Sequence, residues 1–158
     1  AVNASGSVTI PDSPAMWAFP FERENELGGQ PTPEVEKPMD LDFGLHVMMG
    51  TNTTLATVAT DAILTKPQAR RIAIMAQDGM ARAMRWVHSP YDGDSVFVLS
   101  TGRRALSDPD HALSVLGMLA ADCVTRAIAR GVYEADSLGD KESYRSRYGQ
   151  FLSNQSGG

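Results

Sequence analysis

Residues 53–127 alternate between short apolar stretches and longer amphipathic ones, and this alternation limits the possible folds more than any other feature. Residues 53–60 (TTLATVAT) and 95–101 (SVFVLST) are rich in small, β-branched and aromatic residues, which favours two buried strands. We expect the second strand to be central in its sheet and to end at Gly102. Apolar side chains at helical spacing follow each strand. The order strand, helix, strand, helix predicts a layered α/β domain.

Both expected helices have recognisable ends. Thr65 is the expected N-cap of the first helix, because Gln68 follows three positions later as in a capping box. Its apolar stripe predicts an end at residues 88–90 (HSP), where the proline disfavours a helical residue before it. Asp108 is the expected N-cap of the second helix, which should end at Gly131 or shortly after.

The segments on either side of this unit are harder to assign. Residues 1–10 (AVNASGSVTI) predict two short strands around a glycine turn. Residues 11–44 hold six of the nine prolines and many acidic residues, which favours a long loop or mobile linker that buries little. The polar stretch from Gly131 to Gly158 is expected to be a surface tail. Because the chain opens abruptly on a strand-like segment, we expect it to be the C-terminal portion of a longer precursor.

Composition narrows the class of protein. A net charge of −5 and an isoelectric point near 5.1 argue against a nucleic-acid partner. No continuous apolar run approaches the roughly 20 residues of a membrane span, so no membrane partner is predicted. Cys123 is the single cysteine and is predicted to be a buried, inert thiol, which fits a reducing, cytoplasmic location. A periplasmic location stays open. The histidines have no metal-ligand spacing, and no metal or cofactor is predicted; His88 would complement a helix dipole.

Thr53 opens the first predicted strand and has the properties of an N-terminal nucleophile. Such a residue needs a breakable peptide bond before it, a rigid strand beneath it and a free α-amine as its base. A free α-amine has a pKa of about 7.7–8.0, which suits a general base at neutral pH. In this hypothesis Thr53 attacks the Asn52 carbonyl and cuts the chain between the two residues. The alternative is that Asn52-Thr53 is an ordinary polar junction between a loop and a strand.

Two further polar groups are candidates for the same site. Asp92 and Asp94 flank Gly93 just before the second strand, where they could orient the nucleophile or hold an ammonium group. The alternative is a solvated turn, because this composition is typical of turns. Asn3 lies within the first strand-like segment, and its amide could donate to an oxyanion. A structural hydrogen bond is the more frequent explanation for a polar residue in such a segment.

Three motifs in the same order resemble the L-aminopeptidase/D-esterase family. They are residues 51–62 (TNTTLATVATDA), 77–83 (QDGMARA) and 91–97 (YDGDSVF), and the similarity covers most of residues 1–135. The resemblance implies an αββα sandwich like that of the aminopeptidases and ornithine acetyltransferase, incomplete in this chain. It also implies a precursor that cuts itself before a Ser or Thr into two subunits that stay together.

The resemblance places family roles on particular residues. The scissile bond matches Asn52-Thr53, the nucleophile matches Thr53, the supporting acids match Asp92 and Asp94, and the residue near the oxyanion matches Asn3. Residues 1–52 would then be the end of the large subunit, with its acidic processing loop. Residues 53–158 would be the small subunit.

The resemblance also implies substrates and partners. Aminopeptidase members typically have a Ser nucleophile, so Thr53 with Asp92 and Asp94 is closer to the branch that hydrolyses 6-aminohexanoate oligomers (nylonases). The expected activity is hydrolysis of peptide or oligoamide bonds by a tetramer of processed units. The resemblance implies that a longer N-terminal portion, which supplies other active-site groups in the family, precedes these residues in the precursor. Two alternatives stay open: acyl transfer, as in ornithine acetyltransferase, and an inactive relative that binds without catalysis.

Overall fold

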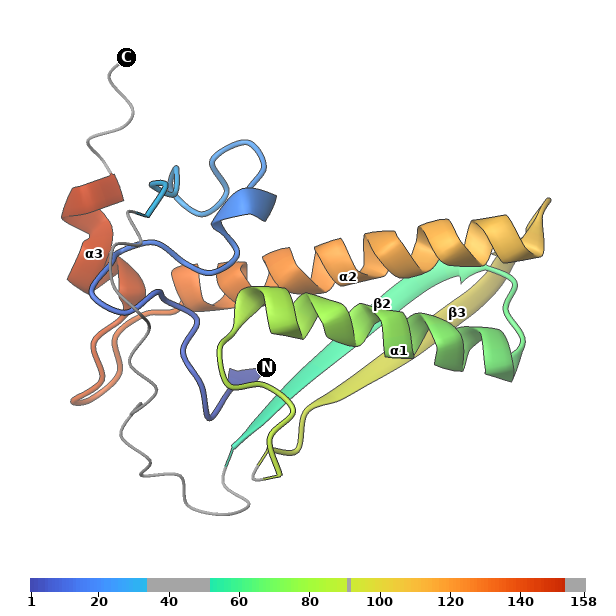
Figure 1. Cartoon of the computed structure of the whole chain (residues 1–158), viewed down its shortest axis with the longest axis horizontal. Helices are drawn as coiled ribbons and strands as arrows, with labels where there is room; N and C mark the ends of the chain where they lie inside the picture. Colours follow the sequence, from blue (N-terminus) through green and yellow to red (C-terminus); the bar gives the residue numbers. More distant parts are fainter. Residues whose placement is uncertain (34–51, 91, 153–158) are drawn as a thin grey trace.

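The computed structural model describes residues 1–33, 52–90 and 92–152. Residues 34–51, 91 and 153–158 lie outside the described residues. They include residues 34–44 of the predicted loop or linker, Thr51 of the first motif, Tyr91 of the third motif and the end of the predicted tail. The described chain forms a small sheet with two long helices beside it (Figure 1). The α/β class predicted from the sequence is therefore confirmed, as a partial sandwich.

The sheet is built around a β-α-β unit. Strands β2 (Thr53–Ala62) and β3 (Ser95–Arg104) are parallel, and helix α1 (Lys66–Ala83) connects them. Strand β1 (Val2–Asn3) pairs antiparallel with the opposite side of β2. Within the described sheet β2 is therefore central and β3 is at the edge, contrary to the prediction that the second strand is central. Gly102 does not end β3, because its φ of 67° lets the strand bend and continue.

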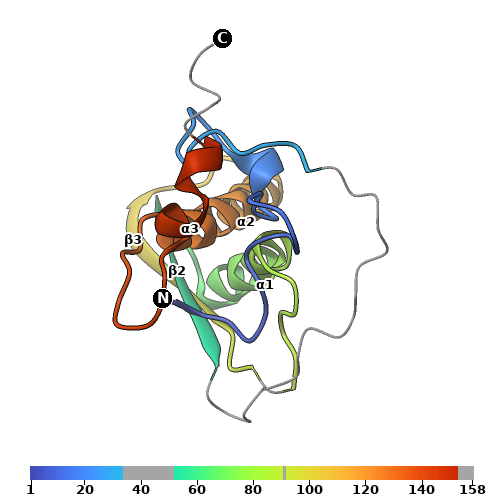
Figure 2. The same cartoon turned by 90° about the vertical axis from the view of Figure 1, so that its left-hand side faces the viewer.

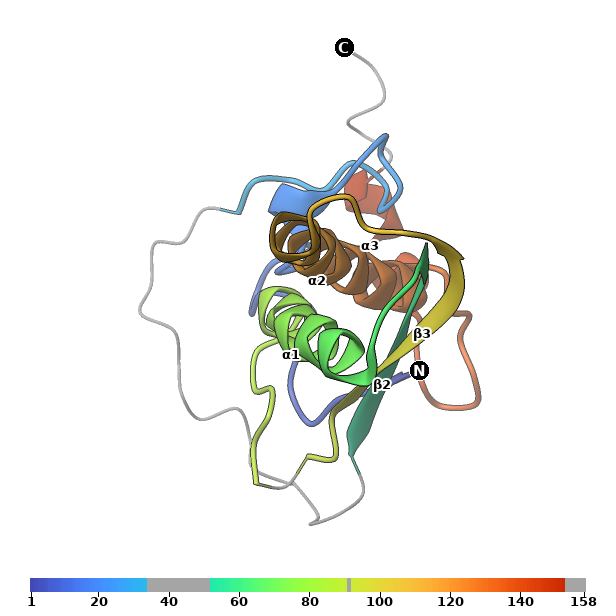
Figure 3. The same ribbon diagram turned by 90° about the vertical axis from the view of Figure 1, so that its right-hand side faces the viewer.

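One face of the sheet is covered by helices and the other is open. Helices α1 and α2 (Pro109–Tyr133) lie on the same side of β2 and β3 (Figures 2 and 3). On the opposite face Leu55, Phe97 and Leu99 are 46%, 57% and 56% exposed. The prediction of fully buried strands is wrong for this face of the described structure, because successive side chains alternate between the two faces.

Helices α1 and α2 pack with very close backbones. A Cβ on Gly79 of α1 would lie 2.2 Å from the carbonyl oxygen of Ala121 in α2, so only glycine fits there. The buried hydroxyl of Thr125 donates to the Gly79 carbonyl oxygen at 3.2 Å. By length and apolar content alone α2 could cross a membrane. The core helix of a globular domain passes the same test, and the packing of α2 on α1 is of that kind.

Three of the four predicted helix ends are confirmed. Thr65 and Gln68 form the capping box of α1, Asp108 accepts from the His111 N–H at the start of α2, and α2 ends two residues after Gly131. Helix α1, however, ends at Ala83 and not at residues 88–90. The next residues leave the helix because the backbone of Arg85 pairs with that of Ser7, at 2.8 and 2.9 Å.

The segment before residue 34 buries far more than its composition suggests. Four of its side chains have no exposed surface: Ala15, Met16, Ala18 and Leu27. The carboxylate of Glu22 accepts hydrogen bonds from three backbone N–H groups in this segment, at 2.6–2.9 Å. It thus satisfies backbone donors that a helix or strand would otherwise pair. Residues 11–33 form a loop, as predicted, apart from the short 3-10 helix η1 (Phe19–Phe21). The prediction that this loop buries little is wrong. The second predicted strand within residues 1–10 is also absent there, where isolated bridges form instead.

The segment after α2 is not simply a tail. Residues Tyr144–Leu152 form helix α3, in which both terminal side chains are buried. The Tyr144 hydroxyl donates to the Pro14 carbonyl oxygen at 2.5 Å and accepts from the Gln30 amide at 3.0 Å. Burial raises the pKa of Tyr144. Helix α3 therefore fastens the N-terminal segment to the end of α2, and the tail prediction is wrong for residues 144–152.

Candidate active site

Thr53 is the first residue of β2, which lies between its two partner strands, β1 and β3. On one side it pairs in register with Asn3 of β1. On the other side, an isolated parallel bridge joins Asn52 to Asp92. This bridge continues the register of the Leu55–Ser95 pair of β2 and β3, so Gly93 lies opposite Thr53. The first residues of β2 are thus held from both sides, although β1 itself has only two residues. Residues that are far apart in sequence meet around the Asn52-Thr53 bond.

The Asn52 carbonyl oxygen accepts two hydrogen bonds. The Thr53 hydroxyl donates to it at 2.5 Å, and the Gly93 N–H donates at 3.2 Å. A Cβ at Gly93 would lie 2.7 Å from Thr53 Oγ1, so a larger residue here would displace that hydroxyl. The hydroxyl of the predicted nucleophile therefore contacts the carbonyl oxygen of the preceding peptide bond, and a backbone N–H polarises that carbonyl. This arrangement suits an N→O acyl shift.

The predicted residue Asn3 is exposed and lies on the strand beside Thr53. The sequence predicted either an oxyanion donor or a structural hydrogen bond at this position. The register places Asn3 next to the predicted nucleophile, so the first role is geometrically available.

Asp92 and Asp94 contact different groups. The Ser5 hydroxyl donates to Asp92 Oδ2 at 2.7 Å, and the Ser5 N–H donates to the same oxygen at 3.5 Å. Asp92 Oδ1 is enclosed and has no hydrogen-bond partner among the described residues. Leaving a buried acceptor unpaired costs about 1–3 kcal/mol, so this oxygen calls for an explanation.

Asp94 fixes the backbone around the site. Its side chain is 2% exposed and accepts from the N–H of Thr54 at 2.9 Å and from the N–H of His88 at 3.1 Å. His88 Nδ1 lies 3.4 Å from the same carboxylate. Asp94 thus clamps the residue after the predicted nucleophile, not Thr53 itself. His88 contacts this carboxylate from the loop beyond α1, because the helix ends earlier than predicted.

Two contributors to the site were missed by the sequence reading. Ser5 was only part of a small-residue segment, and its contact with Asp92 depends on the pairing of β1 with β2. His88 was expected to complement the dipole at a helix end, but α1 ends at Ala83, so this prediction is wrong. His88 lies in the loop beyond α1 with a φ of 58°, which is uncommon for a residue with a side chain, and its contact with Asp94 was not predicted. Position in the fold, and not residue type, identifies both.

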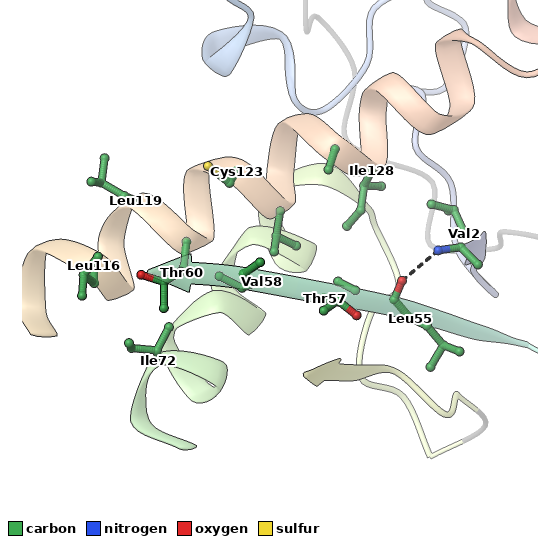
Figure 4. A pocket seen from close by; sticks show the side chains of 16 residues that line it. Val2, Leu55, Thr57, Val58, Thr60, Ile72, Leu116, Leu119, Cys123 and Ile128 are labelled. Carbon is green, nitrogen blue, oxygen red and sulfur yellow. Dashed lines mark hydrogen bonds between the residues drawn. The ribbon is translucent and has the colours of Figure 1, made fainter. Parts of the chain in front are cut away.

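A separate apolar pocket of about 410 Å³ lies away from the Asn52-Thr53 bond. It lies between helix α2 and the part of the β2 edge that extends beyond the end of β1 (Figure 4). The Ala1 α-amine donates to the Leu55 carbonyl oxygen at 2.8 Å at its border. Cys123 lines this pocket and is exposed, so the prediction of a buried thiol is wrong. Cys123 lies on the side of α2 that faces the pocket, and not on the side that packs against α1.

Comparison with known proteins identifies the family. The model of peptidase family S58 matches residues 7–145. Uncharacterized aminopeptidases of Mycobacterium bovis and Mycobacterium tuberculosis are each 35% identical over 158 residues, covering 93% of this chain. The chain belongs to peptidase family S58. An uncharacterized aminopeptidase of Mycobacterium leprae is 38% identical over 103 residues, or 59% of this chain.

Membership of family S58 confirms the resemblance to the L-aminopeptidase/D-esterase family. The family match alone does not separate the nylonase branch from the aminopeptidases. The aligned region is 46% of the length of the first two mycobacterial relatives, so the chain spans about half of each. The arrangement around Asn52-Thr53 lies within the matched residues.

Proposed function

We propose that this family S58 chain belongs to a self-processing amide hydrolase in which Thr53 is the nucleophile. The observation that supports this most strongly is the pair of hydrogen bonds at the Asn52 carbonyl oxygen, from the Thr53 hydroxyl and the Gly93 N–H. The names of the mycobacterial relatives support a peptide or related amide as the substrate. An oligoamide, as in the nylonase branch, fits the Thr nucleophile equally well.

Self-cleavage would proceed through an ester. Thr53 Oγ1 attacks the carbonyl carbon of Asn52, the C–N bond to Thr53 breaks, and the hydroxyl proton passes to the departing nitrogen. The Gly93 N–H would stabilise the oxyanion that forms on the Asn52 oxygen. Water then hydrolyses the ester and leaves a carboxylate on Asn52 and a free hydroxyl and amine on Thr53.

Turnover would repeat the same steps on a bound amide. The Thr53 amine takes the hydroxyl proton, Oγ1 attacks the substrate carbonyl carbon, and the proton passes to the amine that leaves. Water releases the acyl group from Thr53. In this scheme Asn3 donates to the substrate oxyanion, Asp92 accepts from the Thr53 amine, and Asp94 holds the start of β2 rigid. The tetrameric assembly and the cytoplasmic location stay predictions.

The test compares three substitutions of threonine in β2. We expect Thr53→Ala to abolish both self-cleavage and amide hydrolysis in the full-length protein, whereas Thr53→Ser keeps both at a reduced rate because the hydroxyl remains. Thr57→Ala is the matched control, because Thr57 is an exposed residue of the same strand. Full amidase activity in Thr53→Ala would refute the proposal. Acyl transfer to an added amine in excess of hydrolysis would indicate an acyltransferase instead.

A further inference from the structure

A hydrogen bond passes across the start of β2 and connects its two sides. Ser5 follows β1, which pairs with one edge of β2, and Asp92 precedes β3, which pairs with the other edge. The Ser5 hydroxyl nevertheless reaches Asp92 Oδ2 at 2.7 Å. Because Asn3 pairs with Thr53 and Asp92 bridges Asn52, this contact spans the strand at the Asn52-Thr53 bond.

The backbone around Ser5 is held rigidly. A Cβ on Gly6 would lie 1.7 Å from the Arg85 carbonyl oxygen, so the chain at this position is pressed against the end of α1. Ser7 and Arg85 then exchange two backbone hydrogen bonds, at 2.8 and 2.9 Å. Ser5 therefore approaches Asp92 from a bend whose backbone is anchored on Arg85, and its hydroxyl loses little additional freedom when it donates.

The two oxygens of Asp92 are in unequal positions. Oδ2 receives both the hydroxyl and the N–H of Ser5, whereas Oδ1 is enclosed and has no partner among the described residues. The neighbouring Gly93 contacts Thr53 directly, so this carboxylate belongs to the surroundings of the nucleophile. A buried acceptor without a partner among the described residues is suited to a donor that appears only after cleavage.

We infer that Ser5 is a positioning residue: it occupies Oδ2 of Asp92 and so keeps Oδ1 in place to accept a hydrogen bond from the α-amine released on Thr53. This inference rests on the proposed function, because the amine exists only if the chain is cut before Thr53. Ser5 acts through Asp92 and does not touch the substrate. Its loss should therefore affect turnover by the processed enzyme more than substrate binding.

The experiment measures hydrolysis of an aminoacyl p-nitroanilide by the full-length, processed protein. We expect Ser5→Ala to lower kcat about tenfold, in line with the loss of one hydrogen bond to a charged group, and to leave KM within about twofold. Ser5→Thr keeps the hydroxyl and should restore most of kcat. Ser7→Ala is the matched control, because the Ser7 hydroxyl donates to the Thr9 carbonyl oxygen in the same segment and does not contact Asp92.

A double substitution separates positioning from general stability. In an Asp92→Asn background, Ser5→Ala should cause little additional loss of kcat, because the two residues act as one unit. Wild-type kcat in Ser5→Ala, or a full tenfold loss on top of Asp92→Asn, would overturn the inference. If Ser5→Ala does not fold, Ser5→Cys takes its place with the same expected outcomes, because a thiol is a weak donor. An active, uncut Thr53→Ala variant would instead refute the proposed function, whatever Ser5 does.

Discussion

The absence of a side chain at Gly93 allows the close approach of the Thr53 hydroxyl. The missing Cβ of Gly93 leaves room for the Thr53 hydroxyl, and the Gly93 N–H donates to the Asn52 carbonyl oxygen of the proposed cleavage site. A methyl group at this position would lie 2.7 Å from Thr53 Oγ1 and would push the hydroxyl or the β2 backbone away. We therefore expect the identity of this residue to affect the position of the proposed nucleophile, Thr53.

We expect Gly93→Ala to slow self-cleavage at least about tenfold, because small displacements of a reacting group have effects of this size. The measurement is the time course of fragment formation during cell-free synthesis of the protein. Gly149→Ala in helix α3 is the control, because a Cβ at that position meets open space. Unchanged cleavage in Gly93→Ala would contradict the role of this close contact.

At the scale of elements, ion pairs connect the segment before the predicted cut with helix α2. Arg126 Nη2 lies 2.8 Å from Glu26 Oε2, Arg126 Nε contacts the other carboxylate oxygen, and Arg130 approaches at 3.8 Å. The Glu26 side chain is only 12% exposed, so this pair is screened less than a surface pair. After cleavage it would help to hold the two fragments together.

This connection should depend on pH. The hydrogen bond from Arg126 lowers the pKa of Glu26 from its ordinary value of 4.5, while burial opposes that shift. A lowered pKa in the folded state stabilises the protein above pH 4.5, and the stabilisation is lost as the pH falls through the lower, folded-state pKa. We expect Glu26→Gln to lower the Tm at pH 7 and to flatten the decline in Tm below pH 4.5.

Thermal unfolding between pH 7 and pH 3 measures this effect. Glu142→Gln serves as the control, because Glu142 is exposed, and its pH curve should follow that of the unsubstituted protein. If Glu26→Gln and the unsubstituted protein had the same pH curve, the ion pair would contribute nothing to the attachment.

At the scale of the whole molecule, the described sheet presents one apolar face that no described element covers. Leu55, Phe97 and Leu99 are about half exposed on that face, whereas Val98 points toward the helices and is half-buried. Clusters of exposed apolar side chains mark surfaces that bind another surface or cause aggregation. The open face is therefore the surface through which we expect this chain to self-associate when it is made alone.

We expect residues 1–158 made alone to bind the dye ANS and to self-associate. The double substitution Phe97→Ser and Leu99→Ser should reduce both, because it removes the apolar surface without touching the core. Val98→Ser should instead lower the Tm by several degrees, because it places a hydroxyl against the helix layer. Light scattering and ANS fluorescence measure the outcome, and equal binding by the double variant and the original chain would contradict this account.

The sequence predicted local features well and long-range contacts poorly. The Thr65 and Asp108 caps were predictable because capping depends on neighbours within four residues. The burial of Met16 and Leu27 was not, because it arises from packing against elements more than 50 residues away. The relation between Thr53 and Gly93 follows from the parallel register of β2 and β3, which no local pattern determines. Asn52, Thr53 and Asp92 were predicted as site residues from the order of their motifs, and this role stays a prediction.

The central claim is that the chain is cut between Asn52 and Thr53. Intact-mass measurement with N-terminal sequencing of the purified full-length protein tests it most directly. We expect a fragment that begins Thr-Thr-Leu-Ala, together with a fragment that ends at Asn52. A protein that remains a single uncut chain and still hydrolyses amides at full rate would contradict it.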